Sequence, residues 1–151
     1  MIKIMFVCHG NICRSPMAEM VFKDMVRKAH LEHRFLINST ATSREEIGNG
    51  VHHGTRRKLA EEGIPCEPHR AVQMTRTDYK EYDYLIGMDH WNLQNILRSV
   101  GSDPEGKVHL LLDFTDEPGD IADPWYTGNF DLTYKDVTKG CKALLDKFKN
   151  E

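Results

Sequence analysis

Hydrophobic residues follow two periods along the chain, and segments of the two kinds alternate. Short apolar runs such as Ile4–Val7 predict buried strands, whereas a single apolar stripe repeating every three to four residues predicts a helix. We expect strands at residues 3–7, 35–39, 83–88 and 108–114, and helices at 16–30, 56–62, 90–100 and 132–148. The stripe of the last helix consists of Val137, Cys141, Leu144, Leu145 and Phe148.

This alternation predicts the fold class. Parallel strands joined by helices form right-handed crossovers, with helices on both faces of the sheet. We therefore expect an α/β fold, a four-stranded parallel doubly wound sheet in one domain spanning residues 1–151. Cys8, Ser39 and Asp89 each end or follow one of the first three strands. They should meet at the carboxyl edge of the sheet, where such folds bind their ligands.

Composition narrows the range of partners. The chain has 151 residues, of which 40% are hydrophobic and 28% are charged, as in an ordinary globular domain. Its net charge of -3 provides no basic field, so we expect neither nucleic acid nor an anionic membrane as a partner. No apolar stretch approaches about 18 residues, and no charged-then-apolar leader precedes the first strand. We expect a cytoplasmic monomer.

Residues 8–15 form the most informative motif, with the sequence Cys-His-Gly-Asn-Ile-Cys-Arg-Ser between a predicted strand and a predicted helix. Amides at a helix N-terminus bind anions, and Gly10 and Asn11 tolerate the backbone angles of a tight loop. The helix N-terminus and a nearby guanidinium favour the thiolate of Cys8. Arg14 presents a planar fork of donors that can grip two phosphoryl oxygens. The motif therefore predicts nucleophilic attack at phosphorus.

Other interpretations of this motif are weaker. A cysteine that ends a core strand is commonly a small buried apolar residue, but an arginine beside it has no structural use without an anion. Cys8 and Cys13 lack the two-residue gap of a zinc knuckle, and the histidines form no ligand pattern, so we expect no metal. The glycines at 48, 50 and 54 do not directly follow a strand, as those of a dinucleotide site would.

Ser15 has two interpretations that the sequence leaves open. Its hydroxyl can donate a hydrogen bond to the Cys8 thiolate. It can equally be an ordinary residue of the first helical turn before Pro16, which we expect at the first helical position.

Two motifs at opposite ends of the chain carry a family resemblance. Residues 8–15 lie at the N-terminus, and Asp123-Pro124-Trp125-Tyr126 lies near the C-terminus. Together they resemble the low-molecular-weight protein tyrosine phosphatases, and the similarity covers essentially the whole chain. It implies hydrolysis of phosphotyrosine in a tyrosine-phosphorylated protein through a phosphocysteine on Cys8. Inorganic phosphate and other oxyanions would be competitive ligands, and no cofactor is implied.

The resemblance also assigns roles to individual residues. Asp123 is the expected general acid for the leaving phenolate and then the base for water, although composition alone would make it a turn residue. Trp125 and Tyr126 are expected to wall the phosphotyrosine ring. Ser39 and His69 are expected to support the loop through hydrogen bonds. The remaining substrate-binding residues of the loop are His9, Gly10, Asn11, Ile12, Cys13 and Ser15.

The chain departs from the family pattern at the rim of the site. Glu45, beside Glu46, stands where the family often has an aromatic wall residue, and Trp125 stands where tyrosine is common. Thr40 and Val72 are further departures. We therefore expect Glu45 to line the substrate entrance. Our hypothesis is that Glu45 and Glu46 favour peptides with basic residues beside the phosphotyrosine.

The four cysteines are expected to be reduced, because a catalytic thiolate requires a reducing compartment. In the family, the second loop cysteine forms a reversible disulfide with the nucleophile, so the resemblance assigns this to Cys13. The alternative is that Cys13 fills a small apolar space under the loop. Cys66 and Cys141 are expected to be structural.

Two other classes of function fit the sequence less well. Thioredoxin-coupled arsenate reductases have a similar loop, but they need a further cysteine pair in the middle of the chain, and none occurs between Cys66 and Cys141. A noncatalytic phosphotyrosine-binding or redox-sensing module would tolerate the loss of the acid. The presence of Cys8, Arg14 and Asp123 together argues against such a module.

Overall fold

The computed structural model describes residues 1–150, and within that range the chain forms one sheet and six α-helices. The strands are β1 (Ile2–Cys8), β2 (Phe35–Ala41), β3 (Tyr84–Gly87) and β4 (Val108–Leu110). The α-helices are α1 (Arg14–Lys28), α2 (His53–Glu61), α3 (Asp78–Glu81), α4 (His90–Val100), α5 (Pro124–Thr127) and α6 (Phe130–Lys149). Two 3-10 helices, η1 (Glu32–Arg34) and η2 (Leu111–Phe114), complete the description.

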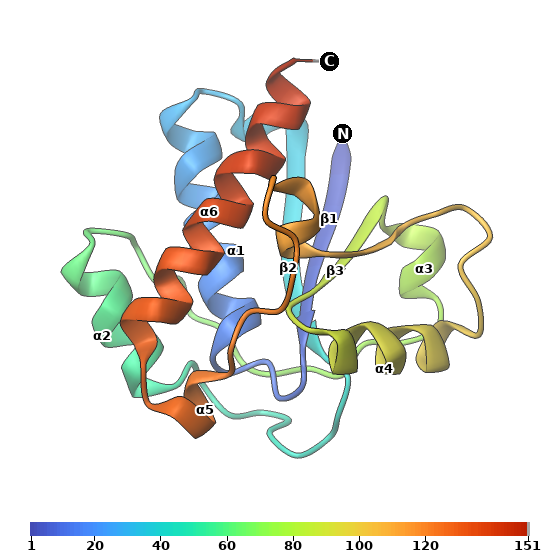
Figure 1. The fold of residues 1–151 in the computed structure, drawn as a ribbon, viewed down its shortest axis with the longest axis horizontal. Helices are drawn as coiled ribbons and strands as arrows, with labels where there is room; N and C mark the ends of the chain where they lie inside the picture. Colours follow the sequence, from blue (N-terminus) through green and yellow to red (C-terminus); the bar gives the residue numbers. More distant parts are fainter. Residues whose placement is uncertain (151) are drawn as a thin grey trace.

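The sheet has the strand order β2-β1-β3-β4, and all its pairs are parallel. Val7 is paired with Thr40 on one side and with Gly87 on the other. The carboxyl ends of the strands therefore share one edge, which lies at the end of the molecule that holds α5 (Figure 1). The predicted four-stranded parallel α/β fold is confirmed.

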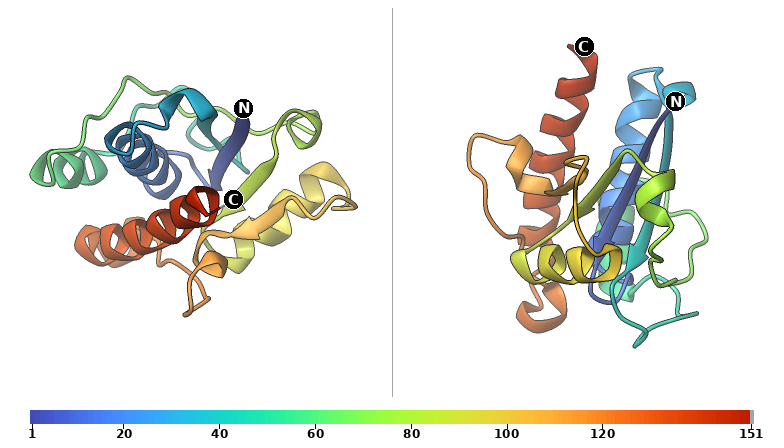
Figure 2. Two further views of the ribbon diagram at one scale, coloured as in Figure 1. Left: turned by 90° about the horizontal axis from the view of Figure 1, so that it is seen from above. Right: turned by 90° about the vertical axis from the view of Figure 1, so that its right-hand side faces the viewer.

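Side chains of β1 alternate between two apolar layers, because successive residues of a strand point to opposite faces. Ile4 and Phe6 join the larger cluster with α1 and α6, whereas Met5 and Val7 join a smaller cluster with α4 and the region around α3. The views in Figure 2 show helices on both sides of the sheet. This burial on both faces is why residues 4–7 form an uninterrupted apolar run.

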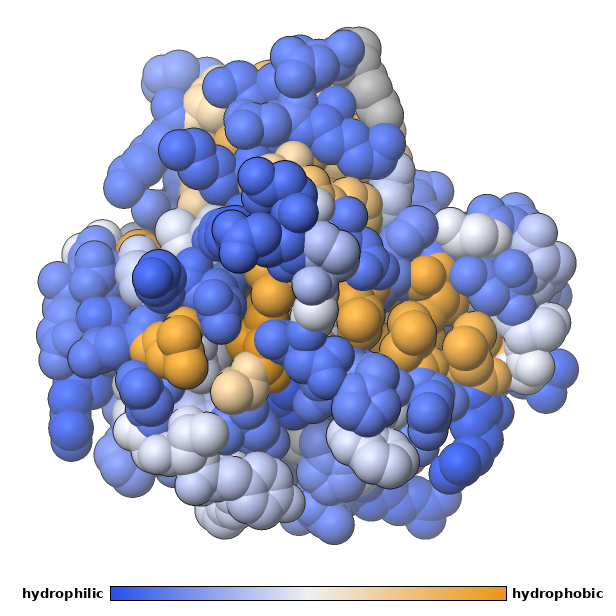
Figure 3. Space-filling view, in the orientation of Figure 1, coloured by the Kyte–Doolittle hydropathy of each residue, from blue (hydrophilic) through white to orange (hydrophobic). Residues whose placement is uncertain are grey.

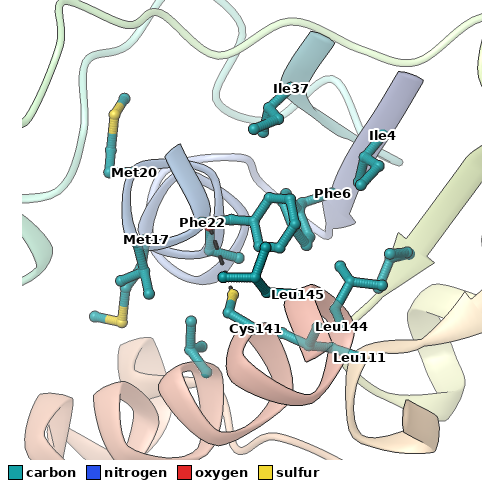
Figure 4. Close-up of a cluster of buried hydrophobic side chains, with 14 of the residues drawn as sticks. Ile4, Phe6, Met17, Met20, Phe22, Ile37, Leu111, Cys141, Leu144 and Leu145 are labelled. Atoms are coloured by element: carbon teal, nitrogen blue, oxygen red, sulfur yellow. Dashed lines mark hydrogen bonds between the residues drawn. The ribbon is translucent and has the colours of Figure 1, made fainter. Parts of the chain in front are cut away.

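Aromatic rings occupy the centre of the larger cluster. Phe22 of α1 makes edge contacts with Phe6 and Phe35, at ring-centroid distances of 5.9 and 5.5 Å, and Phe148 of α6 contacts Phe35 at 5.4 Å. Cys141 of α6 is fully buried beside α1, as predicted, with its sulfur 3.8 Å from a backbone carbonyl (Figure 4). Burying each large apolar side chain contributes about 1.5–3 kcal/mol.

Several element boundaries differ from those predicted. The fourth strand ends at Leu110, not Phe114, because the Asp113 carboxylate accepts a hydrogen bond from the Leu110 amide (3.0 Å) and the chain turns into η2. Helix α2 begins at His53, three residues before the predicted start, because His52 caps it. The two four-residue helices, α3 and α5, are too short to produce an apolar period and are not among the predicted helices.

The face shown in Figure 3 is mostly hydrophilic, with smaller hydrophobic patches near its middle. Among the helices of residues 1–150, none combines the length and the apolar character needed to span a membrane.

Candidate active site

A pocket lies at the carboxyl edge of the sheet and brings the two sequence motifs together. Parallel strands deliver the loop that follows β1 and the loop that follows β2 to this edge, and the chain returns there before α5. The pocket is lined by Cys8, His9, Gly10, Ile12, Cys13, Arg14, Glu45, Glu46, Asp123, Trp125 and Tyr126. All three predicted catalytic residues therefore face one space.

The loop after β1 wraps around the sulfur of Cys8. Asn11 has a φ of 60°, a left-handed conformation that asparagine adopts more readily than most residues, and its amide donates a hydrogen bond to Cys8 Sγ at 3.3 Å. Gly10, unlike Asn11, does not adopt a positive φ. A Cβ there would lie 3.3 Å from Cγ of Glu46, so glycine serves close packing against the next loop.

The structure agrees with both interpretations of Ser15, which lies in the first turn of α1 and beside the Cys8 thiol. Its Oγ lies 3.0 Å from Cys8 Sγ, accepts a hydrogen bond from Asn11 Nδ2 at 2.8 Å, and lies 3.4 Å from the carbonyl oxygen of Thr40, so its proton can be donated to the sulfur or to that carbonyl. The prediction for Pro16 was wrong by two positions. Helix α1 begins at Arg14, which places Pro16 third in the helix, where its missing N–H still costs no helical hydrogen bond.

A buried chain of hydrogen bonds supports the loop from beneath. Asn11 Nδ2 also donates to Ser39 Oγ (3.0 Å), and Ser39 Oγ donates to Glu19 Oε1 (2.6 Å). His69 Nε2 lies 2.9 Å from Asn11 Oδ1 and donates to it, while burial lowers the pKa of this imidazole. The structure thus brings both predicted supporting residues, Ser39 and His69, to Asn11. Glu19 was not predicted as a supporting residue. The one indication in the sequence was a carboxylate at an otherwise apolar position of the helix.

Arg14 is 2% exposed and is held by two aspartates. Its Nη1 donates to Asp89 Oδ2 (2.6 Å) and to the carbonyl of Ile121 (2.9 Å), while Nη2 lies 3.4 Å from Asp123 Oδ2. Burial alone would lower the pKa of Arg14, but Cys8 and the two carboxylates raise it above its ordinary value. The guanidinium Nε is buried and has no hydrogen-bond partner within the described residues.

Asp89 and Asp123 hold Arg14 in the same way, because each caps a helix. Asp89 Oδ1 accepts from the Asn92 amide (2.8 Å) at the start of α4, which leaves Oδ2 for Arg14. Asp123 Oδ1 accepts from the Trp125 amide (3.1 Å) at the start of α5, which leaves Oδ2 at the pocket. The sequence placed Asp89 at this edge but assigned it no role. The sequence feature that could have identified Asp89 is its position directly after a predicted strand and three residues before Asn92, a spacing typical of a helix cap.

The rim of the pocket is exposed. Trp125 and Tyr126 are 57% and 83% exposed, which agrees with a wall rather than a core position. The side chain of Glu45 is 69% exposed, and its Oε2 lies 2.7 Å from Nε2 of His9. Glu46 also lines the pocket, so the rim carries two carboxylates and two large aromatic rings.

The four cysteines are all free thiols and differ in environment. Cys13 is buried with Ile12 and Ala71, and burial, followed by the negative charge of Cys8, raises the pKa of Cys13 to about 12. Cys66 is exposed, so its predicted structural role is wrong. Among residues 1–150, no three His, Cys, Asp or Glu side chains gather in a way that could hold a metal ion.

The sequence matches a known protein family over nearly its whole length. The family model described as "Low molecular weight phosphotyrosine protein phosphatase" matches residues 3–151. The low molecular weight protein-tyrosine-phosphatase YfkJ of Bacillus subtilis (strain 168) is 37% identical over 153 residues, covering 100% of this chain and 98% of the relative. A low molecular weight phosphotyrosine protein phosphatase of Saccharomyces cerevisiae is also 37% identical, covering 97% of this chain and 94% of that protein.

Solved structures agree with these matches. The crystal structure of YfkJ from Bacillus subtilis superposes with a TM-score of 0.96, covering 99% of this chain and 96% of that chain. The crystal structure of a low molecular weight protein tyrosine phosphatase from Streptococcus pyogenes is 40% identical, with a TM-score of 0.88, and covers 97% of this chain and 93% of that chain.

Proposed function

The chain belongs to the low molecular weight phosphotyrosine protein phosphatase family, and from that premise we propose how its residues hydrolyse phosphotyrosine. It is a protein-tyrosine phosphatase, a hydrolase. We propose that Cys8, Arg14 and Asp123 carry out the reaction in two steps through a phosphocysteine. Tyrosine-phosphorylated proteins are the proposed substrates, and inorganic phosphate and related oxyanions are the proposed competitive ligands.

The unpartnered Nε of Arg14 is the observation that carries the proposal. A buried donor without an acceptor costs about 1–3 kcal/mol, so its retention favours a ligand that accepts from it. Nη1 is fixed by Asp89 and Ile121, which orients the guanidinium and leaves its Nε–H for a phosphoryl oxygen. A charge-assisted bond of this kind is strong and directional. Arg14 would hold the phosphoryl group against the Cys8 sulfur, while backbone amides of the loop other than that of Asn11 bind its other oxygens.

In the first step, the Cys8 thiolate attacks phosphorus, the S–P bond forms and the bond from phosphorus to the tyrosyl oxygen breaks. The Ser15 hydroxyl and the Asn11 amide support this thiolate through hydrogen bonds. A proton on Asp123 Oδ2 would pass to the leaving phenolate. Such general acid catalysis contributes about 10²–10⁴ in rate and matters most for basic leaving groups.

In the second step, water attacks the phosphocysteine. Asp123, now a carboxylate, takes a proton from that water through Oδ2, while the S–P bond breaks and Cys8 returns as a thiolate. Inorganic phosphate is the product. The Asp123 hydrogen bond to Trp125 keeps Oδ2 directed at the same place in both steps.

We propose that Trp125 and Tyr126 contact the phosphotyrosine ring, because both are exposed at the pocket and supply broad apolar faces. Stacking of this kind contributes about 0.5–1.5 kcal/mol beyond burial. The aromatic ring of phosphotyrosine separates its phosphate from the peptide backbone. This separation would let the phosphate pass these two rings and reach Cys8. Phosphoserine has no such spacer and would be a poor substrate.

Glu45 and Glu46 are proposed to select the residues around the phosphotyrosine. Both carboxylates line the entrance to a site for an anion, so a bare phosphate ester meets repulsion there. A lysine or arginine near the phosphotyrosine would offset that repulsion. His9, which bonds to Glu45, joins this rim to the phosphate loop.

Cys13 is proposed to guard the nucleophile. If peroxide oxidised Cys8 to a sulfenic acid, the Cys13 sulfur could attack it, forming the disulfide and releasing water. The raised pKa of Cys13, about 12, keeps it a thiol at neutral pH, so it does not compete with Cys8 in phosphoryl transfer. A disulfide that can be reduced again to two thiols suits the reducing cytoplasm. We propose that the enzyme acts there as a monomer.

A leaving-group series tests the mechanism. Aryl phosphates with leaving groups from 4-nitrophenol to phenol are compared for wild type and Asp123→Ala, with the exposed Asp116→Ala as control. We expect Asp123→Ala to lose about 10²–10⁴-fold in kcat for phenyl phosphate and clearly less for 4-nitrophenyl phosphate. An equal loss for all leaving groups would show that Asp123 is not the acid.

A further inference from the structure

Four aromatic rings form a continuous contact beside the candidate active site. His53 stacks on His52 at a centroid distance of 4.3 Å, and His52 also stacks with Phe130 at 5.3 Å with an interplanar angle of 16°. The ring of Trp125 meets His52 edge-on at 5.7 Å. These residues come from α2, the residue that caps it, α5 and α6, so the cluster joins segments far apart in the sequence (Figure 1).

His52 is fixed from two directions. Its backbone amide donates to the carbonyl of Ile12 in the phosphate loop (2.8 Å), and its Nδ1 accepts from the Gly54 amide (3.0 Å) to cap α2. These two bonds set both the position and the plane of the imidazole. A ring that packs on it is thereby placed relative to the phosphate loop.

Gly54 makes room for the ring of Phe130. A Cβ at this position would lie 2.4 Å from the far end of that ring, a distance that no real contact tolerates. Gly54 has no positive φ, so the requirement is for space and not for backbone freedom. Phe130 also packs against the small cluster of Ile12, Cys13 and Ala71 beneath the phosphate loop. Packing contacts on several sides therefore fix the position of the Phe130 ring.

We propose that His52 and Phe130 are positioning residues that hold Trp125, and through it Asp123, over the phosphate loop. This inference rests on the proposed role of Asp123. The α5 segment is only four residues long and its two aromatic rings are exposed, so it has little packing of its own. The Trp125 amide bonds to Asp123 Oδ1, so a shift of Trp125 moves the acid.

The protonation state of His52 agrees with this role. Nδ1 accepts a hydrogen bond and must be unprotonated. Burial lowers the pKa of His52, and the charged groups that face it are His53 and Arg56 of α2, which lower it further, and Glu46, which opposes them. Trp125 and Phe130, which contact it from α5 and α6, carry no charge. The stack is therefore intact at neutral pH.

The first test compares leaving groups, because displacement of the acid reduces rate most for basic phenolates. We expect Phe130→Leu and His52→Asn to lower kcat about tenfold or more for phenyl phosphate, and less than about threefold for 4-nitrophenyl phosphate. Asparagine keeps an acceptor that can cap α2, so His52→Asn removes the stack and retains the helix start. Phe130→Tyr keeps the ring and should retain the wild-type ratio.

Tyr134→Leu is the matched control, since Tyr134 is also an aromatic residue of α6 that packs against the core, but it makes no ring contact with His52. It should lower Tm without changing the ratio of the two rates. If folded His52→Asn has the wild-type ratio while Asp123→Ala shows its leaving-group dependence, the positioning role is wrong and the proposed function stands. If Asp123→Ala also shows no dependence, the proposed function itself fails.

Fluorescence gives a second test that does not depend on activity. In a Trp91→Phe background, Trp125 is the sole tryptophan of the chain. Its emission should change as His52 gains a proton, at a pH below the ordinary range of histidine because burial lowers the pKa of His52. This change should be absent in His52→Asn. Emission with the same pH profile in both proteins would overturn the contact between His52 and Trp125.

Discussion

The phosphate loop and the rim of the pocket differ in how firmly their side chains are held. In the loop, Asn11, Arg14 and Ser15 are each 0–2% exposed and held by side-chain hydrogen bonds, Asn11 with Ser15 and Arg14 with Asp89. At the rim, Trp125 and Tyr126 are mostly exposed and belong to a short helix. The difference separates two tasks: the loop fixes the geometry of the chemistry, and the rim is free to set which substrates reach it.

The largest predicted effect is at the nucleophile, the centre of the rigid region. Cys8→Ser should lower kcat for 4-nitrophenyl phosphate by about 10⁴-fold or more, because a hydroxyl does not replace the thiolate. Steady-state kinetics measures this loss. Cys66→Ser, which changes an exposed thiol, is the control and should retain wild-type activity. Turnover by Cys8→Ser would contradict the mechanism.

Arg14→Lys should have the next largest effect. An ammonium group carries the charge, but it cannot bond to Asp89 and at the same time present an oriented Nε–H to a phosphoryl oxygen. We expect a loss of about 10²–10³-fold in kcat, together with weaker inhibition by orthovanadate. Arg34→Lys, at the surface near β2, provides the control. Equal vanadate inhibition in Arg14→Lys and wild type would show that charge alone suffices.

Asn11 tests whether the rigidity of the loop also stabilises the fold. Asn11→Gly keeps the left-handed backbone but removes the bonds to Ser15, Ser39 and His69, and should cost about 1–3 kcal/mol in the free energy of unfolding. Asn11→Ala should cost about 1 kcal/mol more because of its positive φ. Urea unfolding measures both. Equal stability of the two variants would mean that the backbone conformation stores no strain.

The smallest predicted effect is at the rim. Wild type should hydrolyse phosphotyrosine peptides with lysine neighbours about two- to fivefold faster, in kcat/KM, than peptides with glutamate neighbours. Glu45→Gln combined with Glu46→Gln should remove the preference and leave kcat for 4-nitrophenyl phosphate nearly unchanged. Added salt should weaken the preference in wild type only. Equal kcat/KM for both peptides in wild type would refute the selection by charge.

Much of the rigid region could be predicted because its signals are local. Strand β1, the loop at residues 8–15 and the helix that follows are consecutive in the sequence. The hydrophobic periods of the strand and the helix, together with the motif of the loop, therefore sufficed to place Cys8 and Arg14. Asp123 required the resemblance, since an acidic loop holds several carboxylates. Parallel pairing then brought Ser39 to the edge where it was expected.

The parts that could not be predicted depend on contacts between distant segments. Asp89 and Glu19 are ordinary acidic residues until the fold places them against Arg14 and Ser39. The stack of His52 on Phe130 joins residues 78 positions apart and follows no sequence period. The α5 helix is only four residues long, between caps at Asp123 and Gly128, and is therefore too short to contain an apolar stripe.

The proposed mechanism requires a covalent phosphoryl group on Cys8, and rapid-quench mass spectrometry tests for it directly. Asp123→Ala, which lacks the base of the second step, is mixed with 4-nitrophenyl phosphate and quenched in acid. Cleavage after Lys3 and Arg14 leaves Cys8 and Cys13 on one peptide, so fragmentation must locate the group. We expect the added phosphoryl mass on Cys8. A phosphoryl group on another residue, or burst-phase release of 4-nitrophenol with none on the enzyme, would contradict it.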